Sequence, residues 1–306
     1  ILDESVLSLR LPALMLLRTD GRIVAADARR EFAEGDVKTF VDDIDAILDI
    51  GYHSREGGFF IGYLVWMSID RLGFKEIMTA LAADEAAFDD EDLVALRNRV
   101  AAITGDRATI NMQSERYFFD DFVQRVFTDD GNGDGVLVDG GMSPISIQQE
   151  HMVVEFLGSP LVAVFGPSRL ETTTIYHSFM DAMQAQLDAP VFDTSIDPYQ
   201  LDGYHLQNLT FFEKLRLFPV PLLVPALGKF VSAFADFLHE RDVVLGVIEL
   251  IQGKRATGEW PSELSPSLIG RYSGEPFQVV RDEKWISITT TNDFDVIVTL
   301  WTMPLK

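Results

Sequence analysis

Apolar residues recur every three or four positions along most of the first half of the chain, which is typical of helices that bury one face. One helix is predicted to begin at the capping residue Asp36 and to stop at Gly51. Phe59 to Leu72 is apolar on nearly all sides and predicts a central helix, which Phe74 to Leu81 continues as a further element. We expect antiparallel helices joined by short loops in this half.

Two further helices are predicted before the chain becomes rich in glycine. The acidic run Asp89 to Asp92 predicts a helix start, because negative charge is favoured at the positive end of the helix dipole. Apolar Leu93, Leu96 and Val100 follow at helical spacing. The segment Glu115 to Phe127 has the same spacing and leads into the glycine-rich run.

Helical patterns return after this run. Ile147 to Leu157 and Arg169 to Leu187 predict two helices, and Ser168 followed by Glu171 predicts a capping box at the start of the second. Asp188 to Leu206 has no regular pattern. The middle of the chain is therefore expected to be partly helical and partly irregular.

A long helix is predicted from about Ala226 to Lys254. The segment Leu215 to Leu227 contains three prolines and is interpreted as a buried connector into this helix. The pattern then changes to short β-branched runs between polar turns, which predict three strands over Phe277–Val280, Trp285–Thr291 and Asp295–Trp301.

The expected fold class is therefore mainly α, a multi-helix bundle with a small C-terminal antiparallel β-sheet packed on a long helix. A chain of 306 residues is long enough for two domains. We divide it into an N-terminal helical region ending in an Asp/Gly-rich loop, a helical and irregular connector, and a long helix with the small sheet. These three regions are residues 1–140, 141–225 and 226–306.

The net charge and the absence of cysteine exclude or disfavour several classes of function. The formal net charge is −23 at pH 7, which disfavours nucleic acid as a ligand because such binding needs clustered Lys and Arg. Anionic lipid headgroups should repel the chain for the same reason. There is no cysteine, which excludes disulfides, thiol nucleophiles and zinc sites built from cysteine.

We expect no membrane span within these residues. The most apolar run, Leu215 to Leu227, is shorter than the roughly 20 apolar residues that a spanning helix needs. The chain opens at Ile1 without Met, and we therefore expect a processed or trimmed product with any signal or anchor upstream.

One segment resembles the first half of a calcium-binding loop. Counting from Asp130, the residues at positions 3 and 5 are Asn132 and Asp134, and Gly135 stands at position 6, as in an EF-hand. Position 12, which should be a bidentate Glu, is Gly141. The residues Asp130, Asn132 and Asp134 therefore predict a possible calcium site, with calcium as the only cofactor expected. The alternative is a solvated turn in which Asp and Asn cap their own backbone.

Two histidines have a carboxylate one helical turn away. His151 precedes Glu155 and His177 precedes Asp181 by four residues, so each pair would share a helix face. Two ligands do not make a metal site. A helix-surface pair or a hydrogen-bonded histidine is the commoner outcome.

No common catalytic motif is present. The sequence has no G-x-S-x-G nucleophile elbow, P-loop, G-x-G-x-x-G turn or H-E-x-x-H zinc motif. The adjacent carboxylates Asp42-Asp43 and Asp120-Asp121 are interpreted as solvated helix faces. Three tryptophans near the C-terminus, Trp260, Trp285 and Trp301, either pack in the core or line a ligand groove on the small sheet.

About two-thirds of the chain resembles a group of uncharacterised bacterial proteins that carry an N-terminal membrane anchor and a helical exported body. The resemblance lies in residues 44–81, 88–103, 114–135, 167–183, 253–269 and 273–280. The C-terminal helix and sheet are also similar to the periplasmic part of type II secretion pseudopilins. The resemblance implies an extracytoplasmic location, in the periplasm or cell envelope, and no enzymatic activity is implied.

Two functions from different classes follow from these observations. The first is a non-enzymatic extracytoplasmic envelope or interaction protein, tethered to the membrane, with an unknown envelope protein as partner. The alternative is a carboxylate-based hydrolase that acts on envelope glycans or polymers through paired carboxylates. A weaker third idea is a module in which the Asp130 loop binds calcium for a structural purpose only.

Overall fold

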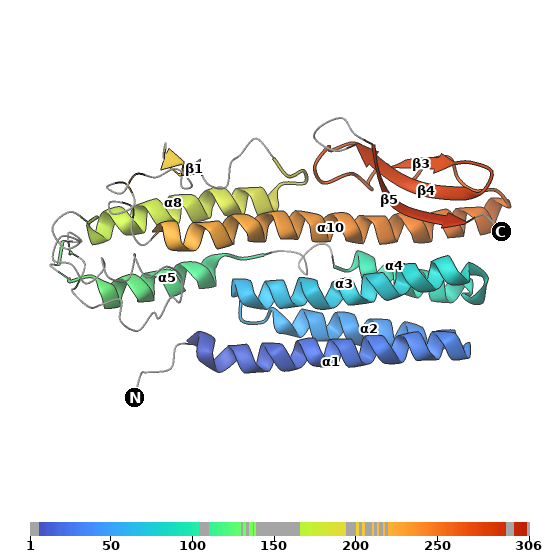
Figure 1. Cartoon of the computed structure of the whole chain (residues 1–306), viewed down its shortest axis with the longest axis horizontal. Helices are drawn as coiled ribbons and strands as arrows, with labels where there is room; N and C mark the ends of the chain where they lie inside the picture. Colours follow the sequence, from blue (N-terminus) through green and yellow to red (C-terminus); the bar gives the residue numbers. More distant parts are fainter. Residues whose placement is uncertain are drawn as a thin grey trace. The chain divides into compact units, whose positions relative to one another are not determined.

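The structure, a computed structural model, describes most of the predicted helices and the C-terminal sheet (Figure 1). The described residues are 6–103, 110–129, 131–132, 135–136, 138, 166–193, 200–201, 204–205, 210, 213, 217, 220–291 and 297–304. The chain forms two compact units. Unit 1 contains Ile1–Ile110, Asp188–Thr194 and Ser232–Lys306, and unit 2 contains Asn111–Leu187 and Ser195–Val231.

Unit 1 opens with helix α1, Val6–Glu34, for which the apolar pattern gave no prediction. Its buried face consists largely of small residues, Gly21, Ala25 and Ala28, in place of the large apolar residues that usually indicate a helix. A Cβ atom at Gly21 would lie 3.0 Å from Cγ2 of Ile69. The small residues therefore allow α1 to approach the neighbouring helix closely.

Helix α2, Val37–Ser54, begins at the predicted cap. The side chain of Asp36 accepts a hydrogen bond from the Thr39 backbone N–H at 3.0 Å. The bonds from the Thr39 backbone and side chain lower the pKa of Asp36, because they stabilise the charged carboxylate. The predicted stop at Gly51 is wrong, since the helix continues for three more residues.

Gly51 has a packing role inside α2. A Cβ atom at this position would lie 2.1 Å from Oδ1 of the buried Asp70 on the next helix. The helix instead ends at Ser54, whose hydroxyl donates to the carbonyl of Gly51 at 2.7 Å. Glycine is needed here for close approach and does not interrupt the helix.

Helix α3, Phe60–Ala83, is one continuous element, where the sequence predicted two. Gly73, at the predicted break, is buried against Leu48 of α2, which its Cβ would meet at 3.4 Å. Helices α1, α2 and α3 contact one another pairwise. Trp66 and Ile69 are buried on α3, as predicted for a central helix.

The short 3₁₀ helix η1, Glu85–Ala87, precedes helix α4, Asp90–Ala101. The acidic start of α4 is confirmed as a complete capping box. Asp89 accepts from the backbone of Asp92, and Asp92 accepts from the backbone of Asp89, both at 2.9 Å.

Unit 2 contains helix α5, Gln113–Val126, and most of helix α8, Arg169–Asp188, close to their predicted ranges. The hydroxyl of Ser168 accepts from the Glu171 backbone at 3.1 Å, as a cap should. Strands β1, Gln200–Leu201, and β2, Tyr204–His205, form a short antiparallel pair. The helix predicted over Ile147 to Leu157 lies outside the described residues.

Helix α10, Val220–Thr257, is longer than predicted at both ends. The expected connector over Leu215 to Leu227 is therefore wrong in its second half, which is helical. Pro221 lies in the first turn, where the missing N–H would have no partner within the helix in any case. Pro225 removes a single hydrogen bond near the same end. From Ser232 onward α10 belongs to unit 1.

The C-terminal sheet consists of β3, Gln278–Arg281, β4, Trp285–Thr291, and β5, Ile297–Pro304, in the antiparallel order β3-β4-β5. Its inner face contacts α10, because a Cβ at Gly246 would lie 3.1 Å from Cδ1 of Ile288. Figure 1 shows the red strands alongside this helix.

The expected fold class is confirmed: the protein is mainly α with a small C-terminal antiparallel sheet packed on a long helix. No helix among the described residues is long and apolar enough to cross a membrane.

Candidate functional site

The structure describes only part of the predicted calcium loop. Of its three proposed ligands, Asp130 and Asp134 lie outside the described residues, and Asn132 lies within them. Among the residues that the structure describes, there is no group of three or more His, Asp or Glu side chains able to hold a metal ion. Calcium binding by Asp130, Asn132 and Asp134 therefore stays a prediction.

The described residues around this loop form a tight turn. Gly131 has a φ of +77°, and its backbone N–H donates to the side chain of Asp129 at 2.9 Å. Thr128 bonds to Val136 through both its backbone and its hydroxyl, at 2.8 and 2.9 Å. A Cβ at Gly135 would lie 1.8 Å from the Thr128 carbonyl oxygen, so this position requires glycine.

His177 and Asp181 share a helix face as predicted, but each contacts α5. His177 Nε2 lies 2.8 Å from Asp120 Oδ1, and Arg116 Nη2 lies 2.6 Å from Asp181 Oδ1. Arg116 also donates to the carbonyl of His177 at 3.4 Å. The two side chains therefore join α5 to α8 and do not form a metal-binding pair with each other. The pair His151 and Glu155 lies outside the described residues.

The same helix pair contains a buried aromatic stack. The rings of Phe119 and Tyr176 lie 3.6 Å apart with an interplanar angle of 10°. Burial raises the pKa of the Tyr176 phenol, because the charged form would lose its hydration. Tyr176 is therefore neutral at physiological pH and serves packing.

The two pairs of adjacent carboxylates, Asp120-Asp121 and Asp42-Asp43, have different surroundings. Asp120 contacts His177, and Asp121 pairs with Arg125 one turn later at 2.8 Å. Burial raises the pKa of Asp43, and the neighbouring negative charges of Asp27 and Glu31 raise it further. Asp43 is thus half-buried against α1, where a solvated helix face was expected.

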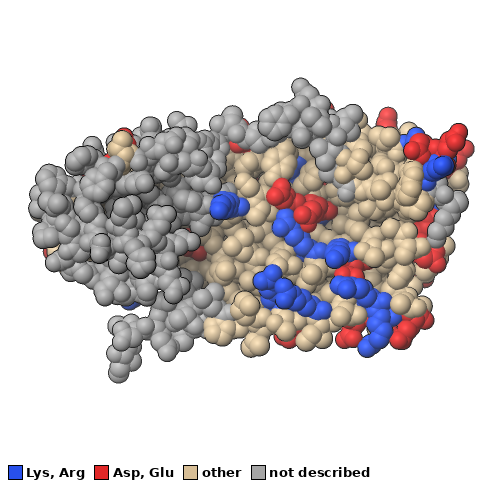
Figure 2. Space-filling view, in the orientation of Figure 1, with Lys and Arg blue, Asp and Glu red and all other residues tan. Residues whose placement is uncertain are grey.

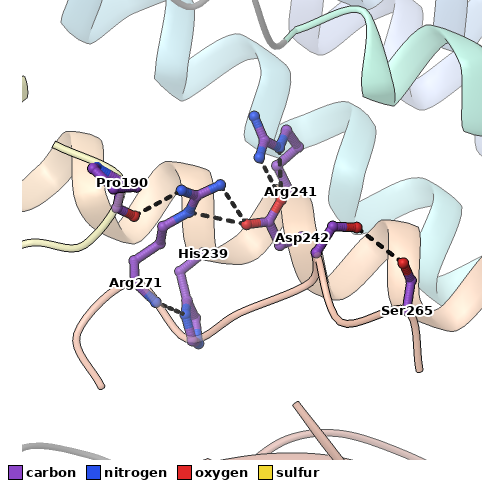
Figure 3. A network of polar contacts seen from close by, with 7 residues as sticks. Pro190, His239, Arg241, Asp242, Ser265 and Arg271 are labelled. Atoms are coloured by element: carbon purple, nitrogen blue, oxygen red, sulfur yellow. Dashed lines mark hydrogen bonds and ion pairs between the residues drawn. The ribbon is translucent and has the colours of Figure 1, made fainter. Parts of the chain in front are cut away.

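A buried ionic network in unit 1 was not predicted (Figure 3). The carboxylate of Asp242, on α10, accepts from Arg241 Nε at 3.0 Å and from Arg271 Nε at 2.9 Å. The side chains of Arg241 and Asp242 are 3% and 2% exposed. Burial lowers the pKa of the Arg241 guanidinium, and the charge of Asp242 opposes this shift.

The network joins three segments of unit 1 that are distant in sequence. Arg271 Nη1 donates to the carbonyl of Pro190 at 2.9 Å, and the Phe192 N–H donates to the carbonyl of Arg271 at 2.7 Å. Both oxygens of the Asp242 carboxylate are engaged by guanidinium groups, in charge-assisted hydrogen bonds. The geometry therefore indicates a structural cross-link.

His239 lies beside this network on α10. The Arg271 backbone N–H points to its Nδ1 at 3.4 Å, and its ring lies 5.3 Å from that of Phe277. Burial lowers the pKa of His239, although Asp242 and Asp236 oppose the shift. The imidazole therefore favours the neutral form in the folded protein.

The three C-terminal tryptophans occupy different environments. Trp301 is buried on the inner face of the sheet. Trp260 is half-buried, with Lys254 Nζ 4.3 Å from its ring centroid. Trp285 is 45% exposed on β4. Of these three tryptophans, Trp285 therefore offers the largest apolar surface to a ligand.

The strand register defines the surface around this side chain. Trp285 pairs with Pro304, and Ser287 lies between Val280 on β3 and Thr302 on β5. Cross-strand partners share a face, as do residues two apart on one strand. The Trp285 face contains Val280, Trp285, Ser287, Thr302 and Pro304, and Gln278 extends it along β3.

The residues of the Trp285 face are themselves uncharged, but a charge lies at its end, where the carboxylate of Asp282 accepts from the Trp285 backbone N–H at 2.7 Å. Val280 is 48% exposed, and the hydroxyl of Ser287 donates to that of Thr302 at 2.9 Å. The opposite face of β4 presents Ile286 and Ile288, both fully buried. The sequence identified Trp285, but only the register brings Val280 and Thr302 beside it. The sequence did not identify the Asp242 network, because an Arg next to an Asp in a helix gives no indication that both are buried.

Comparison with protein-family models, with curated proteins and with solved structures found no match.

Proposed function

We propose that this protein is a non-enzymatic interaction protein of the bacterial cell envelope, located outside the cytoplasm, that binds an envelope partner through the Trp285 face. The observation that carries the proposal is a half-exposed tryptophan beside a half-exposed valine on a sheet face whose other members, Ser287, Thr302 and Pro304, are uncharged. This surface belongs to a chain whose formal net charge is −23.

The Trp285 face has the properties of an interaction hot spot. Tryptophan supplies a large contact area with few rotatable bonds, and it is enriched among the residues that dominate binding energy. The hydroxyl groups of Ser287 and Thr302 provide hydrogen-bonding atoms at the edge of this apolar area. A partner would therefore gain apolar burial over Trp285 and Val280, and the Asp282 carboxylate at the end of the face already accepts backbone N–H groups of Lys284 and Trp285.

The scaffold holds this face in place before a partner binds. The inner side of β4 is packed on α10 through Ile288, which meets Gly246. Sites on rigid elements lose less conformational freedom on binding than sites on loops. The envelope location is supported by the resemblance of much of the chain to anchored, exported bacterial proteins.

The alternative, a carboxylate-based hydrolase acting on envelope glycans, draws no support from three carboxylates that are engaged by basic side chains. Asp120 contacts His177, Asp181 contacts Arg116, and Asp242 is held by two arginines. These contacts favour structural roles.

The proposal is tested by capturing the full-length, tagged protein from cross-linked cells of its own species and identifying the envelope proteins recovered with it. Trp285→Ala removes the exposed ring, and Val94→Ala is the matched control, because Val94 is 47% exposed on α4. We expect the parent and Val94→Ala to recover the same envelope protein, and Trp285→Ala to recover about tenfold less of it.

Two results would contradict the proposal. The first is undiminished recovery by Trp285→Ala in a variant whose circular dichroism equals that of the parent. The second is hydrolysis of an envelope glycan by the purified parent protein, which would favour the enzymatic alternative.

A further inference from the structure

Helix α1 carries a seven-residue pattern on its exposed side. Leu16 and Ile23 are seven residues apart and are 65% and 56% exposed. Arg30 lies seven residues after Ile23, in line with Leu16 and Ile23. Three positions after each of these three residues stands a small residue. These small residues are Thr19, Ala26 and Ala33, all exposed.

This pattern is distinct from the side by which α1 joins the bundle. The buried residues of α1 include Leu14, Gly21, Ala25 and Ala28, and they lie on the other side of the helix. The exposed stripe therefore has no packing role within unit 1. In the notation of a coiled coil, Leu16 and Ile23 stand at position a, and Thr19 and Ala26 at position d.

The stripe is flanked by charge of opposite sign on its two sides. Asp20, Asp27 and Glu34 occupy successive e positions, and Arg22 and Arg29 occupy successive g positions. Charged e and g positions set partner choice and orientation in coiled coils. An acidic row and a basic row along one exposed apolar stripe therefore indicate a helix that pairs with another helix.

The sign of the two rows selects the orientation. In a parallel pair of identical helices, each g residue faces the e residue five positions later on the other helix. Arg22 would then face Asp27 of the second copy, and Arg29 would face Glu34 of the second copy. In an antiparallel pair, g faces g and e faces e, which would place like charges together.

We propose that α1 pairs in parallel with α1 of a second copy of this chain, through Leu16, Ile23 and the small residues between them. The charge complementarity of its two flanks identifies the second copy as the occupant. This surface differs from the Trp285 face, so the two proposals can fail independently.

The flanking charges are accessible for such contacts. Asp27 lies 3.1 Å from Arg30 on its own helix, and its side chain is 47% exposed. Arg29 reaches Glu76 at 2.7 Å through Nε, and its side chain is 58% exposed. Figure 2 shows Lys and Arg side chains interspersed with Asp and Glu side chains on the described part of the face in view.

The pairing should be weak. Thr and Ala at the d positions bury little area compared with the leucines of strong zippers, so the free energy of association is small. The dimer is therefore expected to depend on concentration in the micromolar range.

Sedimentation velocity of the full-length protein tests the proposal. Arg22→Glu brings a carboxylate opposite Asp27 of the second copy, and Asp27→Lys brings an ammonium group opposite Arg22 of the second copy. We expect each variant alone to dimerise about tenfold more weakly than the parent. An equimolar mixture of the two should form a heterodimer of about parental affinity, because each helix then meets opposite charge.

Matched controls separate this effect from net charge. Lys38→Glu and Glu259→Lys change the charge by the same amounts at exposed positions on α2 and after α10, and both should dimerise like the parent. The proposal is overturned if the parent stays monomeric up to about 300 µM. It is equally overturned if the parent dimerises but both reversals leave its affinity unchanged, or if the mixture fails to restore it.

Discussion

At the scale of single residues, the buried charges of unit 1 act as cross-links. Asp242 is 1% exposed and holds Arg241 and Arg271, and Arg271 continues to the carbonyl of Pro190. Removing one partner of such a group leaves an uncompensated buried charge, which is costly. His239, next to this network, therefore lies close to the charges of Asp242, Asp236 and Arg271.

His239 should make the stability of the protein depend on pH. Its pKa in the folded protein is lowered by burial below the ordinary value of 6.5, so the unfolded chain binds more protons between the two values. Its stabilising contribution is complete above the ordinary value and is lost as the pH falls toward the folded-state pKa. We expect the free energy of unfolding, measured with urea, to decrease as the pH is lowered from about 8 to about 5.

The His239→Gln variant isolates this contribution, because glutamine can accept the Arg271 hydrogen bond and does not titrate. It should lose less stability than the parent over the same pH interval. Equal losses in parent and variant would show that other groups cause the pH dependence.

At the scale of elements, helices α2 and α3 approach each other closely at two glycines. Gly51 on α2 faces the carboxylate of Asp70, and a Cβ at Gly62 on α3 would lie 2.6 Å from the carbonyl oxygen of Ser54. Gly73, further along α3, has ordinary van der Waals space around it. In this helix pair Gly51 and Gly62 therefore permit close approach, whereas Gly73 has room for a methyl group.

Substitution by alanine should distinguish these roles. Gly51→Ala forces a methyl group against Asp70 and should destabilise the protein by about 2 kcal/mol or more. Gly73→Ala meets Leu48 at contact distance and should stabilise it by up to about 1 kcal/mol through helix propensity. Chemical denaturation of both variants measures the difference in the free energy of unfolding. Equal effects would contradict the close approach of α2 and α3 at Gly51.

The errors in predicting these elements follow from the same residues. Gly51 was interpreted as a helix stop, and the segment around Gly73 as a break between helices. Glycine weakens a helix by local propensity, but close packing of neighbouring helices outweighs that cost. Conversely, the caps at Asp36 and Asp89 were predicted correctly, because a cap depends on residues within one turn.

At the scale of the whole molecule, charge is the dominant feature. The net charge of −23 implies self-repulsion in the compact state, because 48 Asp and Glu residues outnumber 25 Lys and Arg residues even where these form local ion pairs, such as Arg71 with Glu240 at 2.8 Å. Salt reduces repulsion between exposed charges over distances beyond about 10 Å at 0.1 M.

Added salt should therefore stabilise the protein. Raising NaCl from about 0.02 M to about 0.3 M should increase the midpoint of thermal unfolding, and choline chloride at equal ionic strength should do the same. A midpoint that falls with NaCl would show that surface ion pairs outweigh the repulsion. A rise specific to calcium would instead point to the loop with Asp130, Asn132 and Asp134.

Part of the Trp285 face could be predicted from the sequence. Alternation along β4 places Trp285 and Ser287 on one face, and this follows from the sequence alone. Val280 and Thr302 join them only through the register of three strands. The stripe of Leu16 and Ile23 on α1 was not predicted, and its exposure follows only from the packing of α1 through Gly21, Ala25 and Ala28.

The sequence by itself determined the features that depend on neighbouring residues: the mainly helical class, the helix caps, the strands, and the charge that disfavours nucleic acid. The tertiary structure alone decided which helices run through a glycine and which segments meet. It also showed that Asp242 and Arg271, 29 residues apart, share a buried ion pair. The reason is physical: local propensity is set within a few residues, whereas burial and close approach depend on contacts that the order of the residues does not specify.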